Sequence, residues 1–257
     1  MNHPFQTYWV ECARAWEEIA PAIREATGWG VWNPALYGAH WHAARLEAYP
    51  PEPHPIVMSG LNPGPYGMTQ TGIPFTDMKR VRSDLPKIAA RLAAEGATLE
   101  VPGLAPADLQ TYLVLKHEQS AARFYAFFRA AYGSAEDALT HVVNVNSCML
   151  LFIDTATGKN VTPADLKPAL IRKRHPDWSL ERMKALCDEV SALRIQWVGK
   201  AMEILEPRAV VLLGQNAQAV MGGGHLPATC PEIHYPHPAR KGPEWEAGLI
   251  EALHNYL

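Results

Sequence analysis

Apolar positions recur along the chain in two patterns, one typical of helices and one typical of buried strands. A spacing of three to four residues predicts helices over residues 5–27, 35–49, 83–94, 119–132, 179–205 and 244–256. Short apolar runs predict strands over residues 55–60, 141–145, 209–214 and 232–235, with a short helix after the third. Because the strands alternate with helices and are apolar on both faces, we expect a three-layer α/β/α sandwich around a mainly parallel sheet.

The chain has the length and composition of one large folded domain. Its 257 residues are 48% apolar and 19% charged, which excludes an intrinsically disordered chain. No repeat, low-complexity tract or linker divides the sequence. We therefore expect a single domain over residues 1–257, with the helices of residues 1–50 packed on it.

Composition also excludes several classes of function. The formal net charge of −3 gives no overall basic field. The four cysteines form no C-x-x-C pair, so we expect no metal and no other cofactor. Proline or glycine breaks the longest uncharged runs, residues 53–76 and 209–231, so we expect no membrane segment. The first eighteen residues carry acids and no apolar signal core, which predicts a cytoplasmic protein.

Three loops that follow predicted strands hold polar side chains in otherwise apolar sequence. The first loop begins at Leu61, the second covers residues 144–148, and the third begins at Pro236. Ligands bind beyond the carboxyl ends of parallel strands, so we expect a site where these loops meet. Residues 60–75 are rich in Gly and Pro, and they contain no acid, lysine, cysteine or serine. Their glycine spacing fits neither a phosphate-binding loop nor a dinucleotide fingerprint.

The segment GLNPGPYGMTQTGIPF, residues 60–75, resembles the first motif of the single-strand-selective monofunctional uracil-DNA glycosylases. Further segments match that family in order: EQSAARFYAFFRAAYG (118–133), NSCMLLFIDTATGKNVTPADL (146–166), RAVVLLG (208–214) and HPARKG (237–242). The resemblance implies a uracil-DNA glycosylase-like fold. It also implies a monofunctional enzyme of base-excision repair, which hydrolyses the N-glycosidic bond of uracil, and of 5-substituted uracil, in single- and double-stranded DNA.

The resemblance implies a role for each matched residue. Asn62 would hold the attacking water, and His237 would donate a hydrogen bond to the uracil oxygen where negative charge develops. Phe75 would stack on the flipped base, and Asn146 would read its edge. The backbone near Gly64 and Met68 would line the C5 side of the base, with Tyr66 as a further contact.

These residue types suit the chemistry. Uracil offers an acceptor at O4 and a donor at N3, and a side-chain amide complements both, whereas cytosine presents the reverse pattern. An asparagine cannot act as a general base, so catalysis must rest on stabilising the departing uracil anion and on positioning. Residues 60–75 contain no lysine, and the family that the chain resembles is monofunctional, so we expect no Schiff base and no strand cleavage.

The closing motif departs from the family. It reads H-P-A-R where the family usually reads H-P-S-P, and Lys241 follows at once, so the segment that wedges into the duplex is shortened to Arg240 and Lys241. His234 is near enough in sequence to be the catalytic histidine instead of His237. Basic side chains elsewhere are candidates for contacts with the DNA backbone, unless they are ordinary solvated surface: Lys79, Arg80, Arg172, Lys173 and Arg174.

Two other functions stay open at this point. The altered H-P-A-R motif would also suit a non-catalytic or product-trapping binder of damaged DNA, and the site chemistry would suit a hydrolase of free nucleosides. We expect the protein to be a monomer that binds uracil-containing DNA. We expect it not to associate with a membrane. The sequence does not rank uracil, 5-substituted uracils and deaminated purines as substrates.

Overall fold

The protein is built around a four-stranded sheet whose neighbouring strands all run parallel. The computed structural model describes residues 3–96, 103–113, 117–221, 230–240 and 244–257. The strand order is β3 (Val142–Asn146), β2 (Ile56–Gly60), β6 (Ala209–Leu213) and β7 (Glu232–Tyr235). Every residue of β2, β3 and β6 is buried, as the mainly apolar sequence of these strands predicts.

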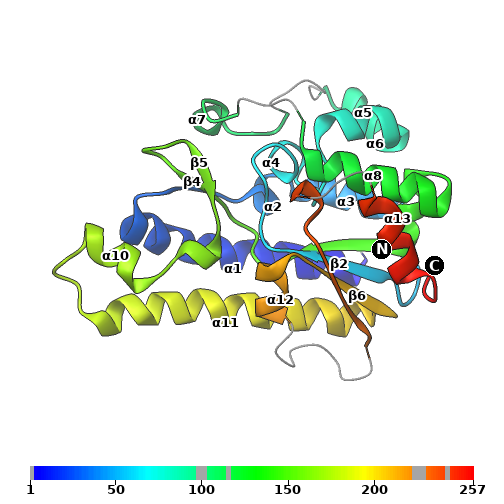
Figure 1. Ribbon diagram of the computed structural model, residues 1–257. Helices are drawn as coiled ribbons and strands as arrows, with labels where there is room; N and C mark the ends of the chain where they lie inside the picture. The colour runs from blue at the N-terminus through cyan, green and yellow to red at the C-terminus, as the bar shows by residue number, and fades with distance from the viewer. Residues whose placement is uncertain (1–2, 97–102, 114–116, 222–229, 241–243) are drawn as a thin grey trace.

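Helices cover both faces of this sheet (Figure 1). One face, which includes Val57, packs on α1 (Pro4–Thr27), α10 (Pro168–Arg174) and α11 (Leu180–Leu205). The other face, which includes Ile56 and Met58, packs on a second set of helices. That set comprises α3 (Ala39–Ala48), α5 (Met78–Asp84), α6 (Pro86–Ala94), α8 (Gln119–Tyr132), α9 (Ala135–His141) and α13 (Trp245–Leu253). The predicted α/β/α sandwich is confirmed.

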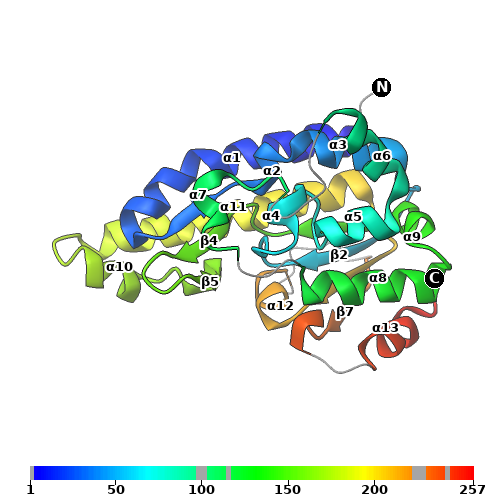
Figure 2. The same cartoon turned by 90° about the horizontal axis from the view of Figure 1, so that it is seen from above.

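The N-terminal helix is part of this packing. Figure 2 shows α1 lying along α11, and the two helices contact each other. Trp9 and Trp16 of α1 are fully buried.

The single domain over residues 1–257 stays a prediction. Within the described residues, no helix is long and apolar enough to cross a membrane.

A second, antiparallel sheet was not predicted. It consists of β1 (Gly30–Trp32), β4 (Leu151–Asp154) and β5 (Lys159–Val161), in the order β1-β4-β5. Its strands are three or four residues long, too short to show a period of two. This small sheet lies beside the ends of the parallel strands from which the loop after β2 leaves (Figure 1).

Two predicted helices are each divided in two. The helix expected over residues 35–49 is α2 (Pro34–Tyr37) and α3, because the chain turns at Gly38, where the backbone of Gly72 packs against it. The helix expected over residues 83–94 is α5 and α6, since Pro86 begins a new helix. Short elements complete the chain: α4 (Met68–Thr71), α7 (Ala107–Gln110), α12 (Gln215–Met221), η1 (Pro163–Asp165) and η2 (Pro238–Arg240).

Candidate active site

A cavity of about 860 Å³ opens at the carboxyl ends of the four parallel strands. Its wall includes Asn62 after β2, Asn146 at the end of β3, Gly214 after β6 and His237 after β7. The small sheet contributes Asn160 to the same wall. The three loops expected to meet at the sheet edge therefore do meet, and the cavity is large enough for a nucleotide and its neighbours.

Gly60, the last residue of β2, lets two of the candidate residues converge. A Cβ atom at this position would lie 2.5 Å from the Phe75 ring and 2.7 Å from Asn146 Oδ1. Phe75 itself has a left-handed backbone with a φ of 54°, which is rare for a bulky residue. Its ring is supported by Phe124 of α8, with the ring centroids 4.4 Å apart. The fold thus holds an aromatic face and a side-chain amide next to each other in the cavity wall.

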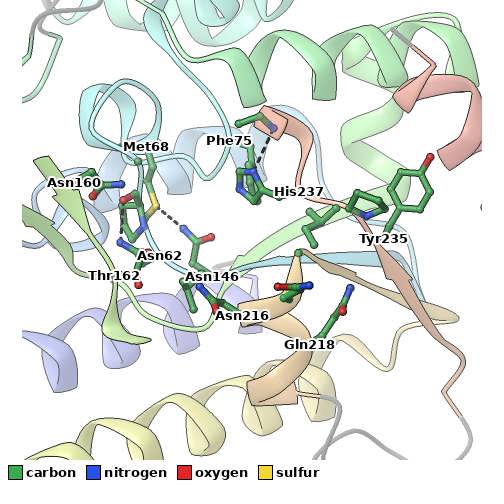
Figure 3. A pocket seen from close by; sticks show the side chains of 18 of the residues that line it. Asn62, Met68, Phe75, Asn146, Asn160, Thr162, Asn216, Gln218, Tyr235 and His237 are labelled. Atoms are coloured by element: carbon green, nitrogen blue, oxygen red, sulfur yellow. Dashed lines mark hydrogen bonds between the residues drawn. The ribbon is translucent and has the colours of Figure 1, made fainter. Parts of the chain in front are cut away.

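The amide of Asn146 is oriented by a weak partner. Its Nδ2 donates to the sulfur of Met68 over 3.3 Å, as Figure 3 shows. The side chain is buried, with 5% exposed. Because a thioether sulfur is a poor acceptor, the amide is held in place yet can still bond more strongly to a ligand.

Asn62 presents its side-chain oxygen for hydrogen bonding. Its Nδ2 donates to the carbonyl of Pro63 over 3.2 Å and, more weakly, to that of Leu150 over 3.5 Å. With the nitrogen used in this way, Oδ1 is the acceptor that remains. An acceptor in this place can hold a water molecule through one of its O–H bonds.

His237 has a defined tautomer. Its Nδ1 accepts a hydrogen bond from the backbone N–H of Ala239 over 3.2 Å, so in the neutral ring the proton is on Nε2. In Figure 3 the ring lies across the cavity from Asn62. His234 also lines the cavity, but its Nε2 lies 3.2 Å from a carboxylate oxygen of Glu232 on the same strand. This geometry favours His237 as the donor to a bound ligand.

Glu118 is a cavity residue that the sequence did not single out. Its carboxyl oxygens lie against the backbone of Gly64 and Gly67, where a Cβ atom would be 2.9 Å and 1.6 Å away. Its backbone N–H donates to Asp77 over 2.8 Å. Burial, helped by the charge of Asp77, raises the pKa of the Glu118 carboxyl to about 7. Glu118 begins the segment 118–133, but nothing in the sequence shows which way its side chain points.

Several uncharged side chains were also missed: Asn160 of β5 and Thr162 just after it, and Gln215, Asn216 and Gln218 of α12. Figure 3 shows the two groups on opposite sides of the cavity. Of the predicted base contacts, Gly64 and Met68 line the cavity, whereas Tyr66 does not. The described residues contain no group of three or more His, Cys, Asp or Glu that could hold a metal ion.

The basic candidates lie outside the cavity wall and fall into two groups. Lys79 and Arg80 belong to α5, and Arg80 is largely buried and bonded to Asp84 over 3.2 Å, which makes it a poor candidate for a DNA contact. Arg172, Lys173 and Arg174 are exposed in the last turn of α10, at the other end of the molecule (Figure 1). The side chain of Arg240 and the whole of Lys241 lie outside the described residues.

The curated relatives of this chain identify its family, and a solved structure shares its fold. The chain is 30% identical over 231 residues to the single-strand selective monofunctional uracil-DNA glycosylase of Rattus norvegicus, covering 87% of this chain and 74% of the rat protein. The protein of the same name from Mus musculus is 31% identical over 228 residues, with the same coverage. The crystal structure of wild-type Pedobacter heparinus SMUG2 shares the fold with a TM-score of 0.57 at 21% identity, over 89% of this chain and 86% of that one. No family model matches the chain.

Proposed function

From the membership of this chain in the family of single-strand selective monofunctional uracil-DNA glycosylases, we propose how its cavity works. The chain is a uracil-DNA glycosylase, an N-glycosyl hydrolase of base-excision repair. The observation that carries the assignment of residues is the convergence of Asn62, Phe75, Asn146 and His237 on one cavity. They come from three segments of the chain, with Asn62 and Phe75 both in residues 60–75, and together they supply a water-holding acceptor, a stacking face, an amide and a ring donor.

The reaction breaks the bond between C1′ of the deoxyribose and N1 of uracil. The bonding electron pair leaves with the base, and a water oxygen forms the new bond to C1′. That water loses one proton to solvent, and the released uracil anion takes up one proton from solvent. Asn62 Oδ1 orients that water, while the Nε2–H of His237 donates to the uracil oxygen that gains negative charge. One fixed donor to a developing anion is typically worth about 3–4 kcal/mol of barrier. None of the described residues that line the cavity is a lysine, so this part of the wall offers no amine for a Schiff base with the abasic sugar.

The base must leave the helical stack before it can enter the cavity. Extrusion costs a few kcal/mol and is cheapest from single strands and mispairs. Stacking on an aromatic ring returns about 1–3 kcal/mol per base. Phe75 provides that ring, and its support by Phe124 keeps the ring in place before the base arrives.

A glycosylase assay with four substrates tests this function. Single-stranded uracil DNA, a U·A duplex, a U·G duplex and free deoxyuridine are incubated with the protein, and uracil release is followed over several turnovers. We expect release from DNA, repeated turnover, and little reaction with the free nucleoside. Tight binding without release would instead indicate a damaged-DNA binder. Faster cleavage of deoxyuridine than of DNA would indicate a nucleoside hydrolase.

We expect excision to be fastest from single strands, slower from U·G and slowest from U·A. The segment after His237 is short, so it fills little of the hole left by a flipped nucleotide and compensates poorly for opening a stable pair. Single-turnover rates on the three substrates measure this order, and Arg240→Ala should slow only the duplex reactions. The rates should fall with salt if α10 and Lys79 bind phosphates. Equal rates on U·A and single strands, or an Arg240→Ala defect that is equal on both, would contradict the role of this segment.

The charge of Glu118 should make the chemical step depend on pH. With a pKa raised to about 7, this carboxyl is largely neutral at pH 6 and ionised at pH 8. An ionised carboxylate in the wall opposes a uracil anion forming in the cavity, so the rate should fall as pH rises through 7. Glu118→Gln keeps the shape and removes this ionisation. We expect its single-turnover rate to exceed that of the wild type by roughly three- to tenfold at pH 8 and by little at pH 6. Every other titratable group is present in both proteins, so parallel pH profiles would refute the role of Glu118.

A further inference from the structure

A buried cation lies beneath the loops that carry the candidate catalytic residues. Arg194 is on α11, in a face that is otherwise lined by apolar side chains such as Val190 and Trp197, and only 5% of it is exposed. Its Nε and Nη2 atoms both lie 3.3 Å from the hydroxyl oxygen of Ser147. Among the residues that the structure describes, no carboxylate forms an ion pair with it. A hydroxyl alone compensates a buried guanidinium poorly, so an apolar residue would stabilise this position better.

Ser147 joins two segments of the site. Its hydroxyl donates to the carbonyl of Leu61 over 3.0 Å, and its backbone N–H donates to the carbonyl of Gly60 over 3.1 Å. Because the hydroxyl hydrogen goes to Leu61, the oxygen can accept from Arg194. Leu61 immediately precedes Asn62, and Ser147 immediately follows Asn146. The guanidinium therefore holds a hydroxyl that helps to fix these two segments to each other, together with the backbone N–H of Cys148, which also donates to the carbonyl of Leu61 over 3.0 Å.

We propose that Arg194 is a positioning residue which, through Ser147, fixes Asn62 relative to Asn146. The inference rests on the proposed function, in which Asn62 orients the water and Asn146 binds the base. A small relative shift of the two segments moves the water away from C1′ while leaving each side chain in the cavity. Such a misplacement lowers the rate of the chemical step more than it lowers the affinity for DNA.

The chain offers a matched control in Arg45. It too is a buried arginine, with 3% exposed, and its Nη2 donates to the carbonyls of Leu139 and Val142 over 2.7 and 3.0 Å. Val142 begins β3, whereas the cavity lies at the other end of that strand. Arg45→Met should lower the thermal midpoint, because it removes the hydrogen bonds to two buried carbonyls, whereas Arg194→Met should leave the midpoint unchanged or raise it. Only Arg194→Met should lower the rate per folded molecule.

The test compares four variants: Arg194→Met, Ser147→Ala, the double variant and Arg45→Met. Single-turnover excision is measured on a single-stranded uracil oligonucleotide, and affinity is measured on the same strand with non-hydrolysable 2′-fluoro-deoxyuridine. We expect Arg194→Met and Ser147→Ala each to slow excision by roughly ten- to a hundredfold with little change in affinity. The double variant should be no slower than the slower single variant, because the two residues act through one contact.

Additive losses in the double variant would overturn the proposal, as would wild-type excision rates for folded Ser147→Ala. Ser147→Ala is the smaller change, so it carries the test if Arg194→Met does not fold. An equal loss in Arg45→Met would show a purely structural effect. If the wild-type protein released no uracil, the proposed function itself would fail, and that result is distinct from every outcome among the variants.

Discussion

Replacing His237 by Ala should slow the single-turnover release of uracil by about 10²–10³-fold, with the protein still folded. The loss follows from geometry. The backbone N–H of Ala239 occupies Nδ1 and leaves the proton on Nε2, where it can meet the base. Without that donor, the negative charge of the departing uracil forms in the cavity unsupported. Asn62→Ala should cause a loss of similar size, because it removes the acceptor that orients the water.

Rapid-quench measurement of the first turnover on a single-stranded oligonucleotide checks both losses. His234→Ala is the matched control, since His234 lines the same cavity but pairs with Glu232. We expect that control to stay within a few-fold of the wild-type rate. If His237→Ala is nearly as fast as the wild type and His234→Ala is slow, the donor is His234. If both variants are fast, the anion is not stabilised by a histidine.

Replacing Asn146 by Asp should abolish most uracil excision and permit weak excision of cytosine. The amide nitrogen of Asn146 donates and its oxygen accepts, which matches O4 and N3–H of uracil. A carboxylate has no donor, so O4 would face a second acceptor, while the amino group of cytosine would find a partner. A site built to hydrogen-bond one pattern rejects the other by as much as about 10⁴-fold, because buried polar groups are left unpaired.

Single-turnover assays on matched uracil and cytosine oligonucleotides measure this exchange of preference. Asn146→Ala serves as the comparison, since it removes the donor and adds no charge. It should lose uracil excision and gain no cytosine excision. Full uracil activity in both variants would mean that Asn146 does not read the base, and the weak contact with Met68 would then be its structural role.

The hydrophobic pattern predicted the main sheet because its strands are rich in apolar residues and are bounded by turns or helices. Residues 209–214, for example, became β6 (Ala209–Leu213) with every residue buried. In the small sheet, β5 is at least partly exposed throughout, and β4 lies in an apolar run, residues 148–153, that was not assigned to a strand. Gly38 ended a helix for a reason outside its own segment, which is the approach of Gly72. Sequence patterns therefore predict helices and strands that bury a long apolar face. They do not predict element boundaries that are set by a single tertiary contact.

The residues of the candidate site also fall into those that the sequence could predict and those that it could not. Asn62, Phe75, Asn146 and His237 could be named because each lies in a segment that resembles a known motif. Glu118 could not, since its place in the cavity depends on contact between the start of α8 and the backbone of the loop after β2. Arg194 was not identified, because it lies in a long helix with a continuous apolar face, and a charged residue in such a helix is normally expected to be exposed to solvent.

The most direct test of the account is multiple-turnover excision from a single-stranded uracil oligonucleotide by the wild-type protein and by His237→Ala. The account predicts that the wild type releases free uracil, leaves an intact strand with an abasic site, and repeats the reaction. It predicts that His237→Ala binds the same strand with similar affinity and releases uracil at least about a hundredfold more slowly. Binding by the wild type without uracil release, or equal release by both proteins, would contradict it.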